Sequence, residues 1–278
     1  MNNYILSGFA DEFDKNIDGQ LAMMKEQNVK FFEPRNITPD LNFADCTIEQ
    51  AKEIKKKMDD IGARASAIGS PLGKIKLSDD VDAHMDKTKH VCELASILEC
   101  DKVRMFSFYP REGGQDDKSW RDEAFEAVGR MLDIAKSYNI TFCHENEHHV
   151  YGETPERCLD LMTTFEDKIK CVFDMGNFVL CGHDPIKAYE LLKNYIAYFH
   201  IKDGTYQGEI VPPGCGEAKI AEIIKMHPTE TFVSLEPHLM TADILKELTE
   251  KTYNQPYVYE NKQAAYLDAM KRLKEILA

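Results

Sequence analysis

Residues 144–149 (HENEHH) place six polar side chains directly after a short apolar run. Carboxylates and imidazoles of this kind bind divalent metal ions or transfer protons. A similar arrangement recurs further along the chain, because other apolar runs also end in such a residue. These ends are Glu145, Asp174 within VFDMGN, His200 within YFHIKDG and Glu236 within SLEPHL. The sequence therefore offers three carboxylates and one imidazole at the ends of apolar runs.

All of these side chains are ligands for divalent cations. An oxygen-rich set favours Mn²⁺, Mg²⁺ or Co²⁺ over a structural zinc site, with Zn²⁺ as an alternative. Three carboxylates packed together would repel one another and raise one another's pKa, and a dication would cancel most of that repulsion. Any one of them could be a helix cap, a loop residue or a core histidine, but a chance placement rarely produces the whole set. We therefore predict that Glu145, Asp174, His200 and Glu236 bind one divalent metal ion.

Neighbouring residues are candidates for contacts with a substrate. Lys202 and His238 follow His200 and Glu236 by two positions, so each shares a strand face with a predicted ligand. Lys202 could bind a substrate oxygen or phosphate, or instead form a salt bridge with a ligand carboxylate. His238 could contact the substrate or support a ligand.

Further candidates lie in other segments. In GSPLGK (69–74), Ser70 and Lys74 could bind an anion, although a plain turn is the commoner outcome for such a segment. Arg104, in the middle of an apolar run, is expected to pair with a buried carboxylate. His144 points to the opposite side of the strand from Glu145, and residues 147–149 are expected in a loop.

Short apolar runs that are typical of strands alternate with longer amphipathic segments. Helical periodicity occurs around residues 51–61, 91–98, 158–165 and 266–277. Helix starts are predicted at Thr47 with Gln50, at Thr154 and at Asp184, and a helix end at Gly62. The predicted strands span residues 4–9, 29–35, 63–69, 101–108, 140–145, 168–174, 196–202 and 230–236.

Eight strand–helix alternations in 278 residues predict an α/β fold, a closed (β/α)₈ TIM barrel in which residues 1–278 form one domain. An open doubly wound sheet is the alternative, but no G-x-G-x-x-G follows the first strand. In a barrel of this kind the carboxyl ends of the strands share one face, where reactive groups collect. The predicted fold therefore gathers the four predicted ligands at one rim.

Composition limits the classes of partner. The formal net charge is −14, which disfavours binding to a nucleic acid backbone and fits a small-molecule or metal partner. The eight cysteines include no C-x-x-C pair. The first residues show no basic region typical of a secretory signal, and no apolar run approaches the length of a membrane span, about 18 residues. We expect a reduced, cytoplasmic protein without a membrane segment.

The chain resembles the xylose isomerase-like barrel superfamily of sugar and sugar-phosphate isomerases and epimerases. The resemblance covers most of the chain and is carried by GFADE (8–12), SPLGK (70–74), RMFSFY (104–109), HENEHHVYG (144–152), FDMGNF (173–178), HIKDG (200–204) and SLEPHL (234–239).

This resemblance implies one metal, most often Mn²⁺, bound by Glu145, Asp174, His200 and Glu236. It also implies that Glu145 and Glu236 form the acid/base pair. Asn177 stands where related ketose epimerases often carry a histidine; it can bind a hydroxyl but cannot titrate. Relatives often pair through the barrel rim, so a homodimer or homotetramer is expected.

We predict a metal-dependent isomerase or epimerase that acts on a sugar or sugar phosphate through an enediolate. A metal that polarises the carbonyl makes the neighbouring proton acidic enough for a carboxylate to remove. Dehydration of a polyol or keto-acid on the same metal site is the main alternative. A phosphodiesterase of the endonuclease IV type would need more histidine ligands and a basic face. Non-catalytic sugar or metal binding also stays open.

Overall fold

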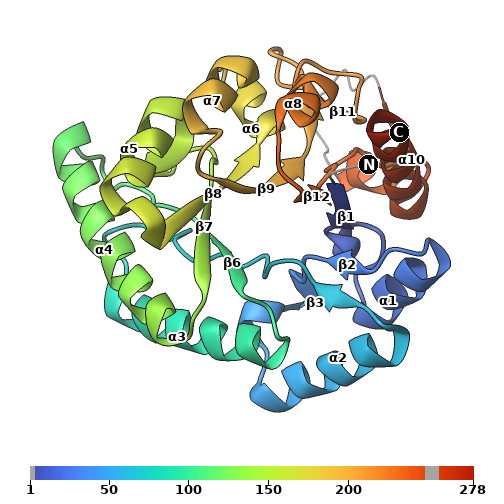
Figure 1. Ribbon diagram of the computed structural model, residues 1–278, viewed down its shortest axis with the longest axis horizontal. Coiled ribbons are helices and arrows are strands. Elements are labelled where there is room, and N and C mark those ends of the chain that lie inside the picture. The colour runs from blue at the N-terminus through green and yellow to red at the C-terminus, as the bar shows by residue number, and fades with distance from the viewer. Residues whose placement is uncertain (1–3, 248–256) are drawn as a thin grey trace.

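In the computed structural model, which describes residues 4–247 and 257–278, a ring of parallel strands is surrounded by helices (Figure 1). The barrel strands follow the predicted positions along the chain. They are β1 (Tyr4–Gly8), β2 (Phe31–Phe32), β5 (Arg64–Ala65), β6 (Lys102–Met105), β7 (Thr141–Glu145), β8 (Ile169–Asp174), β9 (Ile196–Ile201) and β12 (Thr231–Leu235).

Strands β1, β12, β9, β8, β7 and β6 pair in that order to form a curved parallel sheet. The gap between β1 and β6 is filled by β2 and β5, which pair with each other over two residues. Single backbone hydrogen bonds complete the closure. Glu33 N donates to Gly8 O at 3.0 Å, and Ile68 N donates to Lys102 O at 2.9 Å. The predicted barrel is therefore confirmed, although β2 and β5 are shorter than expected.

The helices cover the outside of the strand ring (Figure 1). The described helices are α1 (Ile17–Glu26), α2 (Ile48–Ile61), α3 (Val81–Ile97), α4 (Asp117–Ser137), α5 (Pro155–Phe165), α6 (Met175–Leu180), α7 (Pro185–Leu192), α8 (Ile220–Met226), α9 (Ala242–Glu247) and α10 (Lys262–Leu277). Short elements join them, namely η1 (Ala10–Glu12), η2 (Phe43–Asp45), η3 (Tyr151–Glu153), η4 (Glu166–Lys168), β3 (Asn36–Thr38), β4 (Leu41–Asn42), β10 (Asp203–Gly204) and β11 (Ile210–Val211).

Local sequence signals set several helix ends. Thr47 and Gln50 form the predicted capping box of α2. Thr154 and Asp184 each cap a helix that starts with proline, α5 and α7. Gly62 ends α2 in the left-handed region with φ 71°, a conformation that glycine adopts without steric cost. All four predicted boundary signals are confirmed.

The barrel interior has an apolar layer below a polar one. Ala67, Cys143, Val172 and Tyr198 form a small buried cluster inside the strand ring. The Tyr198 hydroxyl donates to Glu33 Oε1 at 3.0 Å, so the polar layer begins directly above this cluster. Larger apolar side chains fill the space between strands and helices. The apolar layer thus supports the buried charges from below and keeps water out.

The connection between β12 and α10 contains α9, and residues 248–256 lie outside the described part. No helix within the described ranges is both long enough and apolar enough to cross a bilayer.

Candidate metal and acid–base site

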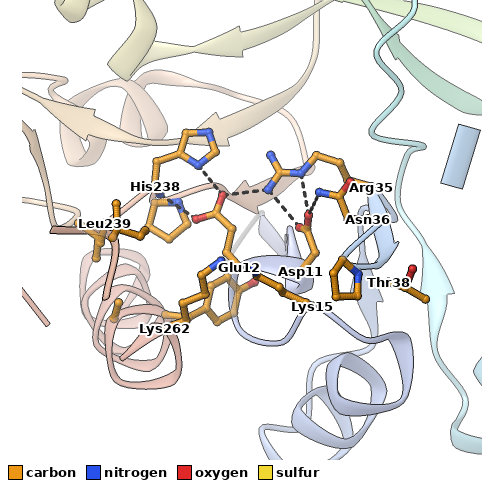
Figure 2. A pocket seen from close by; sticks show the side chains of 14 residues that line it. Asp11, Glu12, Lys15, Arg35, Asn36, Thr38, His238, Leu239 and Lys262 are labelled. Atoms are coloured by element: carbon orange, nitrogen blue, oxygen red, sulfur yellow. Dashed lines mark hydrogen bonds and ion pairs between the residues drawn. The ribbon is translucent and has the colours of Figure 1, made fainter. Parts of the chain in front are cut away.

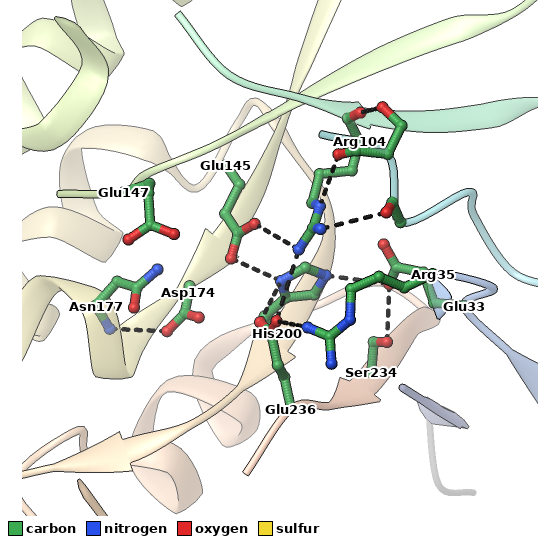
Figure 3. A network of polar contacts seen from close by, with 12 residues as sticks. Glu33, Arg35, Arg104, Glu145, Glu147, Asp174, Asn177, His200, Ser234 and Glu236 are labelled. Carbon is green, nitrogen blue, oxygen red and sulfur yellow. Dashed lines mark hydrogen bonds and ion pairs between the residues drawn. The ribbon is translucent and has the colours of Figure 1, made fainter. Parts of the chain in front are cut away.

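Four side chains converge at the carboxyl ends of neighbouring strands (Figure 3). Glu145 ends β7, Asp174 ends β8, His200 lies near the end of β9, and Glu236 follows β12. All four are buried, and one ligand atom from each lies within 4.8 Å of the others. Strand register explains part of this, because Asp174 and His200 are paired neighbours on β8 and β9. We call these four residues the quartet.

The imidazole of His200 is held by an additional buried carboxylate. Its Nε2 lies 3.0 Å from Glu33 Oε2, and neither side chain is accessible to solvent. Glu33 is itself fixed by Tyr198 and by the Ser234 hydroxyl, which donates to Glu33 Oε2 at 2.9 Å. With Nε2 directed at Glu33, Nδ1 faces the quartet, 2.8 Å from Glu145 Oε1. A carboxylate behind a ligating histidine is a recurrent feature of metal sites.

Glu145 is paired with a buried guanidinium. Arg104 Nη1 donates to Glu145 Oε2 at 3.0 Å, as the sequence predicts for Arg104. The same nitrogen lies 3.6 Å from Glu236 Oε1. Burial by itself would raise the pKa of Glu145, but His200 and Arg104 outweigh it and lower the pKa to about 2. Glu145 is therefore ionised at neutral pH, as a proton acceptor must be.

Glu236 has one engaged oxygen and one free oxygen. Arg35 Nη1 donates to Oε1 at 2.8 Å. His238 Nε2 lies 3.3 Å from the same oxygen. Oε2 is buried and makes no hydrogen bond within the described residues, although Lys202 Nζ lies 3.5 Å away and His200 Nδ1 lies 3.2 Å away. A buried carboxylate oxygen that accepts no hydrogen bond is costly unless cations lie close to it.

Asp174 connects the quartet to α6. Its Oδ1 accepts from Asn177 N at 2.8 Å and so caps α6, while Lys202 Nζ lies 3.0 Å from Oδ2. Lys202 also donates to Asn177 Oδ1 at 3.0 Å. Burial raises the pKa of Asp174 to about 6 even though Lys202 opposes the shift. This carboxyl group would gain most from additional positive charge.

These residues fit a divalent cation. The Glu236 oxygen without a hydrogen bond, the raised pKa of Asp174 and the orientation of His200 are all consistent with an additional cation at the centre of the quartet. Three carboxylates and one imidazole form a donor set that Mn²⁺, Mg²⁺, Co²⁺ or Zn²⁺ accepts. Binding would require His200 to release the proton on Nδ1, since a metal ligand must be deprotonated.

The other predicted residues are distributed unevenly around the quartet. Lys202, for which the sequence left a substrate contact and a salt bridge as alternatives, forms a salt bridge with the quartet carboxylate Asp174, and Asn177 lies next to it. His238 is partly exposed at the rim. Lys74 pairs with Glu147 at 2.8 Å, which places both over the rim (Glu147 is labelled in Figure 3).

Ser70 requires a correction. Its side chain is fully buried, and its hydroxyl donates to the Arg104 carbonyl at 2.5 Å instead of facing the site. The backbone of residues 69–70 also supports the Arg104 guanidinium, which donates to the Gly69 and Ser70 carbonyl oxygens. Ser70 therefore positions Arg104 and is not available to a substrate.

Two site residues went unassigned in the prediction from sequence. Glu33 and Arg35 follow β2 and contact His200 and Glu236, respectively. The signal was present, because Glu33 ends the run VKFFE just as Glu145 ends ITFCHE. Applying the strand-end criterion to the second strand would have identified it.

Comparison with known proteins agrees with the barrel fold. The sequence model of the xylose isomerase-like TIM barrel family matches residues 21–276. The chain therefore belongs to the xylose isomerase-like TIM barrel family. No curated protein sequence matches it.

Solved structures share the barrel at low sequence identity. A D-tagatose 3-epimerase-like protein is 17% identical with a TM-score of 0.74, covering 98% of this chain and 96% of its own. A family member from Mycobacterium smegmatis, in complex with magnesium, is 16% identical with a TM-score of 0.69, covering 99% and 97%. The probable 3-DHS dehydratase AsbF from Bacillus anthracis is 17% identical with a TM-score of 0.69, covering 85% and 92%.

Proposed function

We propose that this protein is a metal-dependent isomerase or epimerase that acts on a sugar or sugar phosphate. The observation that carries the proposal is the quartet itself, whose ligand atoms lie within 4.8 Å of one another at the rim of the barrel. Two of its members are glutamates from β7 and β12, strands separated in the sheet by β8 and β9. Carboxylates that approach from non-adjacent strands can address opposite faces of one carbon atom.

In this proposal Glu145, Asp174, His200 and Glu236 hold one divalent cation, with Mn²⁺ as the preferred ion. When bound, the cation supplies positive charge that stabilises the oxyanion developing on a sugar carbonyl. The donor set accommodates Mg²⁺, Co²⁺ and Zn²⁺ as well. Glu33 keeps the Nδ1 atom of His200 directed at the quartet.

The two glutamates move the proton. One carboxylate, ionised at the start, takes the proton from the carbon next to the carbonyl, and the other, protonated beforehand from solvent, gives its proton to the opposite face of that carbon. Positioned acids and bases of this kind contribute about 10²–10⁴-fold in rate. Arg104 contacts Glu145 and Arg35 contacts Glu236, so each guanidinium stabilises the ionised form in which its glutamate accepts a proton and to which it returns after giving one up. A 1,2-isomerisation would use the same removal step and return the proton to the neighbouring carbon.

Rim residues orient the substrate in this account. Lys202 can donate to a substrate oxygen from its position beside Asp174, and Asn177 can bind a hydroxyl. His238 faces the cavity beside Glu236, and Lys74 can reach the substrate from the opposite side after leaving Glu147. Lys202, Asn177, His238 and Lys74 therefore remain our proposed substrate contacts.

The test is solvent proton exchange at a sugar carbon. Purified protein with Mn²⁺ is incubated in deuterated water with a panel of ketoses and ketose phosphates, and deuterium incorporation is followed by NMR. We expect exchange with at least one ketose pair, and its loss in Glu236→Gln while circular dichroism and the unfolding midpoint stay native. Absence of exchange across the panel would contradict the proposal.

Dehydration is a second candidate because Lys202 lies between two carboxylates. Its Nζ is 3.0 Å from Asp174 and 3.5 Å from Glu236, so it could protonate a leaving hydroxyl after the α-proton is removed. Loss of water from the product, detected by mass spectrometry, separates this reaction from epimerisation.

A further inference from the structure

A cavity of ≈ 300 Å³ opens beside the quartet (Figure 2). It lies between η1, the segment after β2, the segment after β12 and the first turn of α10. Arg35 and His238 line it, and both contact Glu236 Oε1, at 2.8 Å and 3.3 Å. Pockets for small ligands begin at about this size. A molecule that reaches the quartet can therefore extend into the cavity past Glu236.

The two carboxylates in the cavity wall already have partners. Asp11 Oδ2 accepts from Arg35 Nε at 2.9 Å and from Asn36 Nδ2 at 2.6 Å. Glu12 accepts from the His238 backbone at 2.8 Å, and its other oxygen lies 2.7 Å from His238 Nδ1. Figure 2 shows these contacts across the upper part of the cavity. The carboxylates thus hold Arg35 and His238 in place and do not offer a free cation site.

His238 is held in an unusual backbone conformation by these contacts. Its φ is 48°, in the left-handed region that a histidine seldom adopts. Burial would lower the pKa of the imidazole, but the charges of Glu12 and Glu236 outweigh it and raise the pKa to about 9. Strained residues of this kind often mark a ligand contact.

Two lysines in the same wall have no counter-ion. Lys15 is exposed and Lys262 is half-buried, and neither makes a hydrogen bond or ion pair with another described residue. Figure 2 places both on the side of the cavity below Asp11 and Glu12. The carboxylates beside the cavity, Asp11, Glu12 and Glu236, are already engaged by Arg35 and His238, so the two ammonium groups add positive charge that no described carboxylate pairs with. This excess of positive charge stands out in a chain of net charge −14.

Tyr266 adds a hydroxyl donor to the cavity wall. The side chain lines the cavity and is 3% exposed, yet its hydroxyl makes no hydrogen bond with the described residues. Burial, together with Glu12 and Asp11, raises the pKa of the phenol, so the proton stays on the oxygen. Gly8 permits this position, because a Cβ there would lie 2.4 Å from the Tyr266 hydroxyl oxygen. The glycine that opens the GFADE segment therefore makes room for the phenol.

We propose that this cavity binds an anionic group of the substrate, a phosphate or a carboxylate, through Lys15, Lys262 and the Tyr266 hydroxyl. The inference rests on the proposed function, because it assumes that the reacting carbon lies at the quartet. An oxyanion accepts hydrogen bonds from all three groups and neutralises the excess positive charge. A neutral sugar would leave both ammonium groups without a counter-ion.

The test is calorimetric titration of the metal-free protein, prepared on a chelating resin, at low ionic strength. Inorganic phosphate is the probe in one arm and acetate in the other. The key variant is Lys15→Gln/Lys262→Gln, and the control is Lys52→Gln/Lys56→Gln, which removes the same charge from the exposed face of α2. We expect one site in the wild-type protein, affinity at least about tenfold lower in the key variant, and little change in the control.

Tyr266→Phe should weaken binding of the same probe by a smaller factor. Tighter binding of phosphate identifies a phosphorylated substrate, and tighter binding of acetate identifies a carboxylic acid. Equal binding by the wild type and the key variant, or no binding of either probe, would overturn the inference. The titration needs neither metal nor turnover, so it can fail while the exchange assay succeeds. Failure of the exchange assay alone would leave an anion site without the proposed activity.

Discussion

His200 Nε2 lies 3.0 Å from Glu33 Oε2, and both side chains are fully buried at the centre of the barrel (Figure 3). This contact directs the other ring nitrogen at Glu145, Asp174 and Glu236. Without Glu33 the imidazole could rotate or change tautomer, and the lone pair of Nδ1 would no longer be fixed. The order of the quartet therefore depends on a residue outside it.

Glu33→Gln should weaken binding of Mn²⁺. Loss of such a supporting carboxylate typically costs about 10–100-fold in metal affinity. Titration calorimetry on wild type and variant measures the change, with Glu190→Gln on the outer helix α7 as the control. Unchanged affinity in Glu33→Gln would show that the orientation of His200 does not depend on Glu33.

Much of the fold was predictable because barrel strands and helix ends have strong local signals. Thr47, Thr154, Asp184 and Gly62 were read correctly, since capping depends on residues adjacent in sequence. By contrast, α4 (Asp117–Ser137) was not singled out, although Asp116 caps it and its buried residues recur at helical spacing. The short pairing of β2 with β5 could not be predicted from the sequence, because it depends on how the barrel closes.

Replacing Arg104 should destabilise the metal-free protein. Arg104→Met leaves Glu145 buried without its guanidinium partner, and breaking a buried pair costs about 3–5 kcal/mol. Mn²⁺ should restore part of that loss, since the cation supplies the missing charge. Urea unfolding with and without Mn²⁺ measures both effects.

The matched control for Arg104 is a surface pair. Arg64→Met removes the contact with Asp59, in which both side chains are exposed, and should cost less than about 1 kcal/mol. A loss for Arg104→Met as small as that for the control would mean that Glu145 does not need its partner.

Gly8→Ala tests the close approach of α10 to β1. A Cβ at position 8 would lie 2.4 Å from the Tyr266 hydroxyl oxygen, so the ring must move, at a cost of about 1–3 kcal/mol. The same substitution in a Tyr266→Phe background should cost less, because the clashing atom is gone. A double-mutant cycle, measured by chemical denaturation, gives the coupling free energy between positions 8 and 266. Additive losses would contradict direct contact.

Stability should fall below about pH 6.5 in part because of His84. Its Nε2 accepts a hydrogen bond from Gly73 N at 2.9 Å, and burial, with a smaller effect of Lys87, lowers the pKa of His84 to about 4. Between these two pH values the unfolded chain binds the proton and the folded one does not. The contribution of neutral His84 to the free energy of unfolding is therefore fully present above about pH 6.5 and is lost as the pH falls toward 4.

For a buried histidine this loss reaches about 3 kcal/mol. His84→Gln keeps an acceptor for Gly73 N but cannot titrate, so the free energy of unfolding should fall less steeply between about pH 7.5 and pH 5. Parallel pH dependence in wild type and variant would exclude His84 as a source of the acid sensitivity.

Site residues at strand ends were predictable, and those that act through three-dimensional neighbours were not. Glu145, Asp174, His200 and Glu236 each follow an apolar run, so the barrel brings them together in a predictable way. Arg35 reaches Glu236 across 201 positions of sequence, and Tyr266 meets Gly8 only after α10 packs on β1. Such contacts have no local pattern in the sequence.

The most direct test of the quartet is a crystal of the protein soaked in Mn²⁺ and measured at the manganese absorption edge. We predict one strong anomalous peak at the centre of the quartet, contacting Glu145, Asp174, Nδ1 of His200 and Glu236. Peaks confined to exposed carboxylates, with none among these four residues, would contradict the account.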